Sequence, residues 1–239
     1  MGDRNQVVGI GAGGHAKILA EILATAGDHV LVGFTDADAR RWGGKLMGFP
    51  ILGGDDELAG LRASGVHAAF IGVGAVSGAG TKLRARLYQK AVDLGFQMLT
   101  LVHPQAVVAP SATLGPGSVV MGGAVLSTDV RVGANVTVYS GTVVEHDSVL
   151  QDHAALSPGV RLAGGVTVGQ GAFIGIGASI IQGVRIGRWA TVGAGAAVLA
   201  DVPDEATAVG VPARLVGPRA PGAMGEPAAA ARRGKEPKV

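Results

Sequence analysis

The chain has 239 residues, of which 48% are hydrophobic and 16% charged, a composition that excludes a disordered protein. It has no cysteine, which excludes disulfides, thiolate metal sites and a cysteine nucleophile. The net charge of +2 divides into +4 from Arg214 onward and −2 for the rest, so we expect no nucleic-acid partner.

The first hundred residues alternate apolar runs with helical stretches. The apolar runs predict strands at 6–11, 29–34, 68–74 and 96–102, and the stretches between them predict helices at 15–25, 55–63 and 81–94. Strands and helices that alternate in this way are typical of an α/β domain with a parallel sheet. We therefore predict a Rossmann-like N-terminal domain over residues 1–101.

A glycine-rich motif follows the first predicted strand and opens the first predicted helix. Gly9, Gly11 and Gly14 form a GxGxxG pattern, whose backbone amides and helix N-terminus favour a phosphate group. Asp36 lies where an acidic side chain meets a ribose or a base in dinucleotide sites. The alternative is a turn that only lets helix and sheet pack. The region after residue 101 is predicted below to be a β-helix, and it leaves no room for a hydride-transfer site. We therefore expect the ligand to be a nucleotide diphosphate rather than a redox cofactor.

From Val102 to Val198 an aliphatic residue recurs at every sixth position, and all seventeen of these anchors are Val, Leu or Ile. One hexad fits a flat strand and a corner, so three hexads close a coil of 18 residues, with successive coils about 4.8 Å apart. The repeat therefore predicts a parallel β-helix domain over residues 102–217. Residues 218–239 are rich in Pro, Ala, Gly and charge, and we expect them to be a disordered tail.

One histidine stands at a predicted outward corner of this β-helix. His146 lies two positions after the anchor Val144 and between Glu145 and Asp147. A neighbouring carboxylate can fix the tautomer of an imidazole and raise its basicity, as a general base requires. Gly164 lies 18 residues further on, at the same corner of the next coil, and its backbone N–H is a candidate oxyanion donor.

These features resemble the hexapeptide-repeat sugar acyltransferases of the sialic acid O-acetyltransferase type. That family includes enzymes that N-acetylate nucleotide-linked 4-amino sugars. The resemblance spans residues 5–217 and is strongest at GAGGHAK, residues 11–17, and over residues 143–178, which contain the EHD triplet. It implies a left-handed β-helix, a homotrimer with active sites between subunits, and acetyl-CoA as co-substrate with no metal.

The resemblance also implies roles for particular residues. The predicted substrate contacts are Gly11, Gly13, Gly14, His15, Lys17 and Asp36. His146 is the expected general base and Asp147 its orienting partner. Gly164 is expected at the oxyanion and Gln182 along the pantetheine groove. The family often has a second histidine nine residues after the first, and Ala155 stands there, so His153 is a surrogate candidate at the acetyl-CoA site.

The predicted reaction is direct N-acetylation of a nucleotide-linked 4-amino sugar for surface glycan synthesis. One alternative is O-acetylation of a sugar such as sialic acid, and another is a non-catalytic β-solenoid scaffold. A zinc-dependent carbonic anhydrase would need His103, His146 and His153, whose separations of 43 and 7 residues do not stack them. The sequence shows neither a signal peptide nor an apolar run of about 18 residues, so we expect a cytoplasmic protein without a membrane partner. The base, the sugar and the acyl chain are left open.

Overall fold

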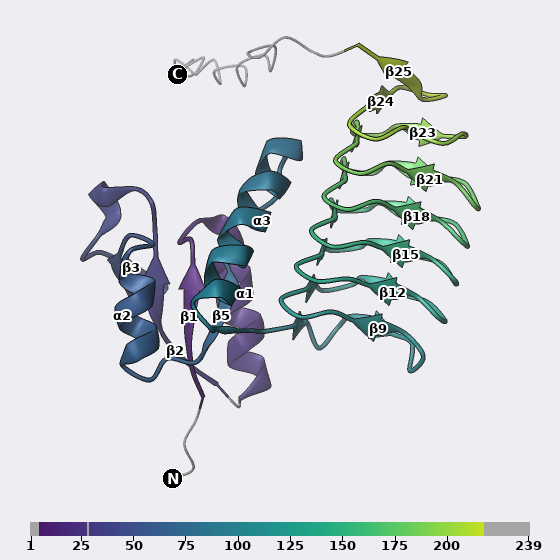
Figure 1. The fold of residues 1–239 in the computed structure, drawn as a ribbon. Helices are drawn as coiled ribbons and strands as arrows, with labels where there is room; N and C mark the ends of the chain where they lie inside the picture. Colours follow the sequence, from purple (N-terminus) through teal and green to yellow (C-terminus); the bar gives the residue numbers. More distant parts are fainter. Residues whose placement is uncertain (1–4, 28, 218–239) are drawn as a thin grey trace, which may run out of the picture.

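The computed structural model describes residues 5–27 and 29–217, and the predicted disordered tail lies outside these described residues. An N-terminal α/β domain lies beside a prism of stacked coils (Figure 1). None of the helices within these residues is both long and apolar enough to cross a membrane.

The N-terminal domain is built on a six-stranded sheet with the order β3-β4-β2-β1-β5-β6. Its strands are β1 (Asn5–Ile10), β2 (His29–Thr35), β3 (Lys45–Leu46), β4 (Phe49–Gly53), β5 (Ala68–Ile71) and β6 (Gln97–Met98). All pairings are parallel except that of β3 with β4. Since β1 pairs with both β2 and β5, the strand order reverses at β1, and a crevice for a ligand is expected at the carboxyl ends of these strands.

Three α-helices cover this sheet: α1 (Gly14–Ala26), α2 (Glu57–Ala63) and α3 (Gly78–Asp93). Leu19 and Leu23 of α1 belong to the core on one face of the sheet, whereas Leu58 of α2 and Ala91 of α3 belong to the core on the other. The sequence analysis missed β3, β4 and the 3-10 helix η1 (Ala39–Arg41). The β4 segment FPILG contains a proline and ends in glycine, which weakens the strand signal.

The β-helix has three flat faces, each a column of two-residue strands. Face 1 consists of β7 (Leu101–Val102), β10 (Val119–Val120), β13 (Thr137–Val138), β16 (Ala155–Leu156), β19 (Phe173–Ile174), β22 (Thr191–Val192) and β24 (Thr207–Val209), with β25 (Arg214–Val216) antiparallel at its end. Face 2 consists of β8 (Val107–Val108), β11 (Val125–Leu126), β14 (Val143–Val144), β17 (Arg161–Leu162), β20 (Ser179–Ile180) and β23 (Ala197–Val198). Face 3 consists of β9 (Thr113–Leu114), β12 (Arg131–Val132), β15 (Val149–Leu150), β18 (Thr167–Val168) and β21 (Arg185–Ile186).

The predicted 18-residue stacking is present throughout the coils. Val144, for example, pairs in parallel with Leu162, one coil further along face 2. The anchors point inward, and Val144, Leu150 and Leu156 of one coil are completely buried. Each such side chain contributes about 1.5–3 kcal/mol by leaving water, so a column of anchors supplies most of the core of this domain.

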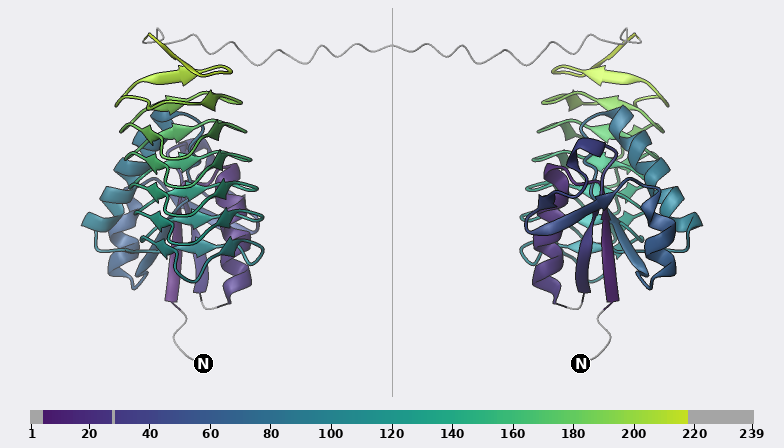
Figure 2. Two further views of the ribbon diagram at one scale, coloured as in Figure 1. Left: turned by 90° about the vertical axis from the view of Figure 1, so that its right-hand side faces the viewer. Right: turned by 90° about the vertical axis from the view of Figure 1, so that its left-hand side faces the viewer.

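The N-terminal domain packs on face 1 and on the corner that joins face 3 to face 1 (Figures 1 and 2). Helix α3 runs along this corner and contacts successive coils. Thr81 Oγ1 donates a hydrogen bond to the carbonyl oxygen of Gly171 at 2.9 Å, and the Tyr88 ring meets the His153 ring edge-on at 5.6 Å. The two domains are thus joined by specific buried contacts.

Candidate functional site

A cavity of about 550 Å³, here called the crevice pocket, lies at the carboxyl ends of β1, β2, β4 and β5. It is lined by Gly11, Ala12, Gly13, Gly14, His15, Ile18, Asp36, Ala37, Asp55, Gly72, Val73, Gly74, Val76, Leu83, Leu87 and Tyr139. Five of the six predicted substrate contacts are therefore brought together. The sixth, Lys17, is exposed on α1 and is not among the lining residues.

The glycines of the motif have distinct physical roles. Gly11 has a φ of 96°, and a Cβ there would lie 2.5 Å from Cγ2 of Val73, so only glycine fits. At Gly13 and Gly14 no atom lies within 4 Å of the position of a Cβ, so the backbone is open to the cavity. Because α1 begins here without a side-chain cap, its first amides are free to bind an anion.

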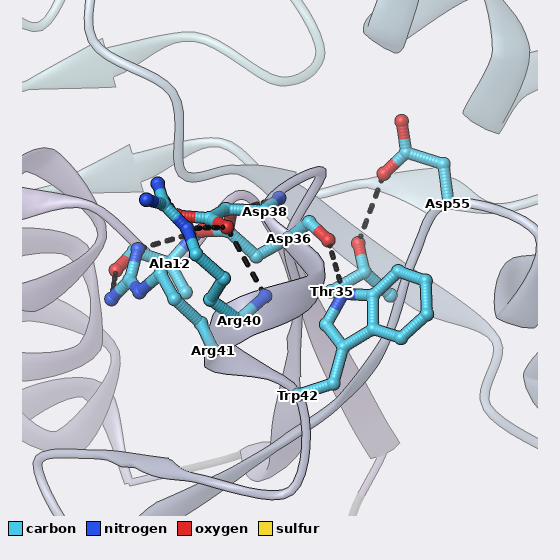
Figure 3. A network of polar contacts seen from close by, with 8 residues as sticks. All are labelled: Ala12, Thr35, Asp36, Asp38, Arg40, Arg41, Trp42 and Asp55. Atoms are coloured by element: carbon cyan, nitrogen blue, oxygen red, sulfur yellow. Dashed lines mark hydrogen bonds and ion pairs between the residues drawn. The ribbon is translucent and has the colours of Figure 1, made fainter.

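Asp36 ties the loop after β2 to the glycine-rich loop (Figure 3). Its Oδ2 accepts from the Ala12 N–H at 3.0 Å and from Arg41 Nη1 at 2.7 Å, and its Oδ1 accepts from the Asp38 N–H at 2.9 Å. The Trp42 indole donates to the Asp36 carbonyl oxygen at 2.7 Å. Three of the roughly four acceptor positions of the carboxylate are thus used, which leaves room for one ribose hydroxyl or base donor.

Two polar side chains that line the crevice pocket were missed by the sequence analysis. Asp55, whose Oδ1 accepts from Thr35 Oγ1 at 3.3 Å, follows β4, the strand that was also missed. Tyr139 comes from the β-helix, and its hydroxyl accepts from the Ala75 N–H at 3.1 Å. The signal for Tyr139 was its rarity, since the chain has two tyrosines, but nothing in the repeat placed it against the other domain.

His15 lines the crevice pocket as a neutral ring. Burial, and to a lesser degree the nearby Arg84, lower the pKa of His15 to about 3. Arg84 Nη1 lies 3.4 Å from Nε2 of His15, so Nε2 is the acceptor and the proton belongs on Nδ1. The ring also packs against Tyr139 at 5.6 Å. His15 is therefore suited to contact a ligand but not to serve as a base at neutral pH.

His146 lies at the corner that joins face 2 to face 3, with a 63% exposed side chain. Its Nδ1 is 2.7 Å from Oδ2 of Asp147, which itself adopts a left-handed φ of 60°. This hydrogen bond is the main reason that the pKa of His146 is raised. With the proton on Nδ1 facing Asp147, Nε2 carries the free lone pair, the arrangement that general-base catalysis needs.

Gly164 lies beneath the His146 ring, as the 18-residue spacing predicts. A Cβ at Gly164 would come within 2.6 Å of both Cε1 and Nε2 of His146. Within residues 5–27 and 29–217 the N–H of Gly164 has no hydrogen-bond acceptor, so it is available to an oxyanion. Gln182, one coil further, is exposed.

His153 lies at a different corner from His146, the one where α3 packs. Its Nδ1 is 3.0 Å from Asn135 Nδ2, and burial lowers its pKa. The structure therefore does not bring the two histidines together within one chain. His103 accepts from the Gln105 N–H at 3.0 Å. In the part of the chain that the structure describes, no group of three His, Asp or Glu side chains is placed to hold a metal ion.

An α/β domain with a crevice at a glycine-rich loop, followed by a hexapeptide β-helix with an exposed His–Asp pair, defines the class of β-helical sugar acyltransferases. Residues 6–91 match the family model of the PglD N-terminal domain, and residues 165–200 match that of the bacterial transferase hexapeptide with six repeats. No match was found among the curated proteins.

Three solved structures resemble this chain over 88–89% of its length. GDP-perosamine N-acetyltransferase (PerB) from Caulobacter crescentus, in complex with CoA and GDP-perosamine, is 41% identical with a TM-score of 0.82, over 89% of this chain and 97% of that one. The acetyltransferase domain of PglB from Neisseria gonorrhoeae, in complex with acetyl coenzyme A, is 35% identical with a TM-score of 0.81, over 89% of this chain and 100% of that one. WeeI from Acinetobacter baumannii is 26% identical with a TM-score of 0.78, over 88% of this chain and 100% of that one.

The chain belongs to the hexapeptide-repeat family of nucleotide-amino-sugar N-acetyltransferases. The predictions of the family, of an α/β domain followed by a left-handed β-helix, and of an acyltransferase are confirmed.

Proposed function

We propose that the protein transfers the acetyl group of acetyl-CoA to the 4-amino group of a nucleotide-linked sugar. The observation that supports this proposal is the crevice pocket at the glycine-rich loop and the N-terminus of α1, together with the likeness to PerB over 97% of that enzyme. Because the PerB structure holds GDP-perosamine, a GDP-linked 4-amino sugar is the first substrate to test. Residues 1–101 hold the nucleotide and residues 102–217 carry the acyl transfer, in the cytoplasm, where both substrates are made.

The residues at the His146 corner support a direct transfer. The amine nitrogen attacks the thioester carbonyl carbon while Nε2 of His146 takes the proton that the nitrogen loses. Asp147 stabilises the imidazolium, and the Gly164 N–H donates to the oxyanion of the tetrahedral intermediate. When the C–S bond breaks, His146 returns the proton to the CoA thiolate. The products are the acetamido sugar and CoA, and Gln182 lines the groove for the pantetheine arm.

The active site is proposed to lie between subunits of a homotrimer. Tyr139 of the crevice pocket stands at the corner between faces 1 and 2, whereas His146 stands at the corner between faces 2 and 3. A second copy packed on face 2 would bring the His146 corner of one chain to the crevice pocket of the other. Exposed aliphatic side chains flank this face, among them Val107 at 60%, Ile176 at 62% and Leu199 at 54%.

The test is a thiol-release assay with acetyl-CoA and a panel of GDP-, UDP- and dTDP-linked 4-amino sugars, with sialic acid alongside. Turnover of one amino sugar establishes the N-acetyltransferase and names its base. Activity on sialic acid alone would favour O-acetylation, and no thiol release with any acceptor would favour a scaffold. A mass measurement by light scattering in the same buffer tests the trimer.

A further inference from the structure

Arg84 of α3 is a buried cation without a counter-ion. Its side chain is 1% exposed, and within residues 5–27 and 29–217 no carboxylate pairs with it. Burial lowers the pKa of Arg84 to about 10, so the guanidinium stays charged at neutral pH. A buried charge is costly unless it is paired, so an unpaired one calls for an anion that the described residues do not supply.

The guanidinium lies directly behind the wall of the crevice pocket. Nη1 donates to the carbonyl oxygens of Val73 and, at 3.2 Å, of Ile71, and it lies 3.4 Å from Nε2 of His15. Val73 and His15 line the pocket. Nη2 donates to Asn135 Oδ1 of the β-helix at 2.9 Å. Arg84 thus donates to the carbonyl oxygens at the end of β5 and just after it, and it orients His15.

The lining of the crevice pocket itself has no cation. It contains the carboxylates of Asp36 and Asp55, the neutral ring of His15 and no lysine or arginine. A nucleotide diphosphate bound there meets the amides of the glycine-rich loop and the N-terminus of α1, which carry partial charges only. Arg41 reaches the rim of the pocket at Ala12, but its guanidinium is paired with Asp36 Oδ2 at 2.7 Å. The formal positive charge that contacts the walls formed by Val73 and His15 is that of Arg84.

We propose that Arg84 is the positive charge that balances the diphosphate of the substrate, acting through His15 and the β5 carbonyl groups rather than by contact. The inference rests on the proposed function, since it requires a nucleotide diphosphate in the crevice pocket. Arg84 is a positioning residue on this view. It makes the pocket favour anionic ligands over neutral ones while remaining inaccessible to water and to competing carboxylates.

A merely structural role must be separated from this electrostatic one, because Arg84 also joins α3 to the β-helix. Asn135 offers the means: Asn135→Asp keeps an oxygen for Nη2 and places a carboxylate against the guanidinium. Aspartate tolerates the left-handed backbone of this position, where φ is 54°. The substitution leaves Arg84 in place, supplies its counter-ion and touches no residue that lines the pocket.

The experiment is calorimetric titration of the full-length protein with GDP, UDP and dTDP, followed by the nucleoside of whichever binds. Asn135→Asp is expected to weaken diphosphate binding about tenfold and nucleoside binding hardly at all, with an unchanged or higher melting temperature. Arg84→Gln should give the same selective loss and Arg84→Lys a smaller one. Arg86→Gln, an exposed arginine on the same helix, and His153→Asn are the controls. His153→Asn alters the Asn135–His153 bond and the ring contact with Tyr88 but no bond of Arg84.

Each outcome supports or overturns the role of Arg84 in diphosphate binding. Equal losses for diphosphate and nucleoside, or full diphosphate affinity in Asn135→Asp, would overturn the role of Arg84 and leave the proposed function standing. If the unchanged protein binds none of the three diphosphates, the proposed function and this inference fail together. Should Arg84→Gln not fold, the Asn135→Asp variant still decides, since it keeps every bond that Arg84 makes.

Discussion

The imidazole of His146 lies across the backbone of Gly164, one coil further along the same corner of the β-helix. The space above Gly164 is filled by the ring, because a methyl group there would lie 2.6 Å from Nε2. The φ of Gly164 is not left-handed, unlike that of Gly165 at 68°, so it is the contact and not the backbone conformation that requires glycine. The two residues therefore form one unit.

Gly164→Ala is expected to push the His146 ring off its position and to lower turnover by about 10-fold to 100-fold. The fold should hold, since the His146 ring is exposed and can move and the backbone angle suits alanine. Steady-state kinetics and thermal melting check both statements.

A double substitution separates displacement of the ring from any other effect of the methyl group. If Gly164→Ala acts through His146, it should add little to the loss caused by His146→Ala, so the effects are strongly non-additive. Fully additive losses would show that the methyl group acts independently, for example by blocking acetyl-CoA.

His146→Ala is expected to lower turnover by about 10² to 10⁴-fold. The pH dependence tests its role more sharply. The bond to Asp147 raises the pKa of His146, and a base works only when neutral, so activity should fall as the pH drops through this raised pKa. Asp147→Asn removes the carboxylate, which lowers the pKa of His146 and moves the acid limb of kcat/KM to lower pH. An acid limb that stays in place would exclude His146 as the titrating base.

The β-helix could be predicted almost residue by residue because its physics is local and periodic. Each hexad buries its own anchor, so the burial of Val144, Leu150 and Leu156 can be predicted from the repeat alone, without reference to the rest of the chain. The stacking of Gly164 under His146 follows from the same period. These are features that an 18-residue coil dictates.

Contacts between the two domains could not be predicted in this way. The contacts of Tyr139 with Ala75 and of Arg84 with Asn135 depend on how the N-terminal domain docks on the β-helix. No periodicity connects positions so far apart in the sequence. A buried arginine in a helix with an exposed Arg86 two positions later has no distinguishing sequence signal. The same holds for His153, whose corner was predictable but whose contact with Tyr88 was not.

Asp36→Asn is expected to weaken nucleotide binding about tenfold and to lower the free energy of unfolding by about 1–3 kcal/mol. An amide has one acceptor oxygen. If this oxygen replaces Oδ2, the NH₂ group faces the Asp38 N–H, and if it replaces Oδ1, the NH₂ group faces the Ala12 N–H and the Arg41 guanidinium, so at least one donor loses its partner in either orientation. Titration calorimetry and urea unfolding measure the two effects. Asp38→Asn is the matched control, because its bond to Arg40 is exposed and should matter little. Equal effects of the two substitutions would contradict the role given to Asp36.

Thr81→Val tests the docking of α3 on the β-helix. The hydroxyl of Thr81 donates to the Gly171 carbonyl oxygen at 2.9 Å in a buried position, and valine keeps the shape while leaving that oxygen without a partner. We expect a loss of about 1–3 kcal/mol in urea unfolding. Thr25→Val, where the hydroxyl bonds to the Ile22 carbonyl oxygen on an exposed part of α1, should cost less than about 0.5 kcal/mol. If Thr81→Val is as mild as Thr25→Val, this hydrogen bond does not contribute to the docking of α3 on the β-helix.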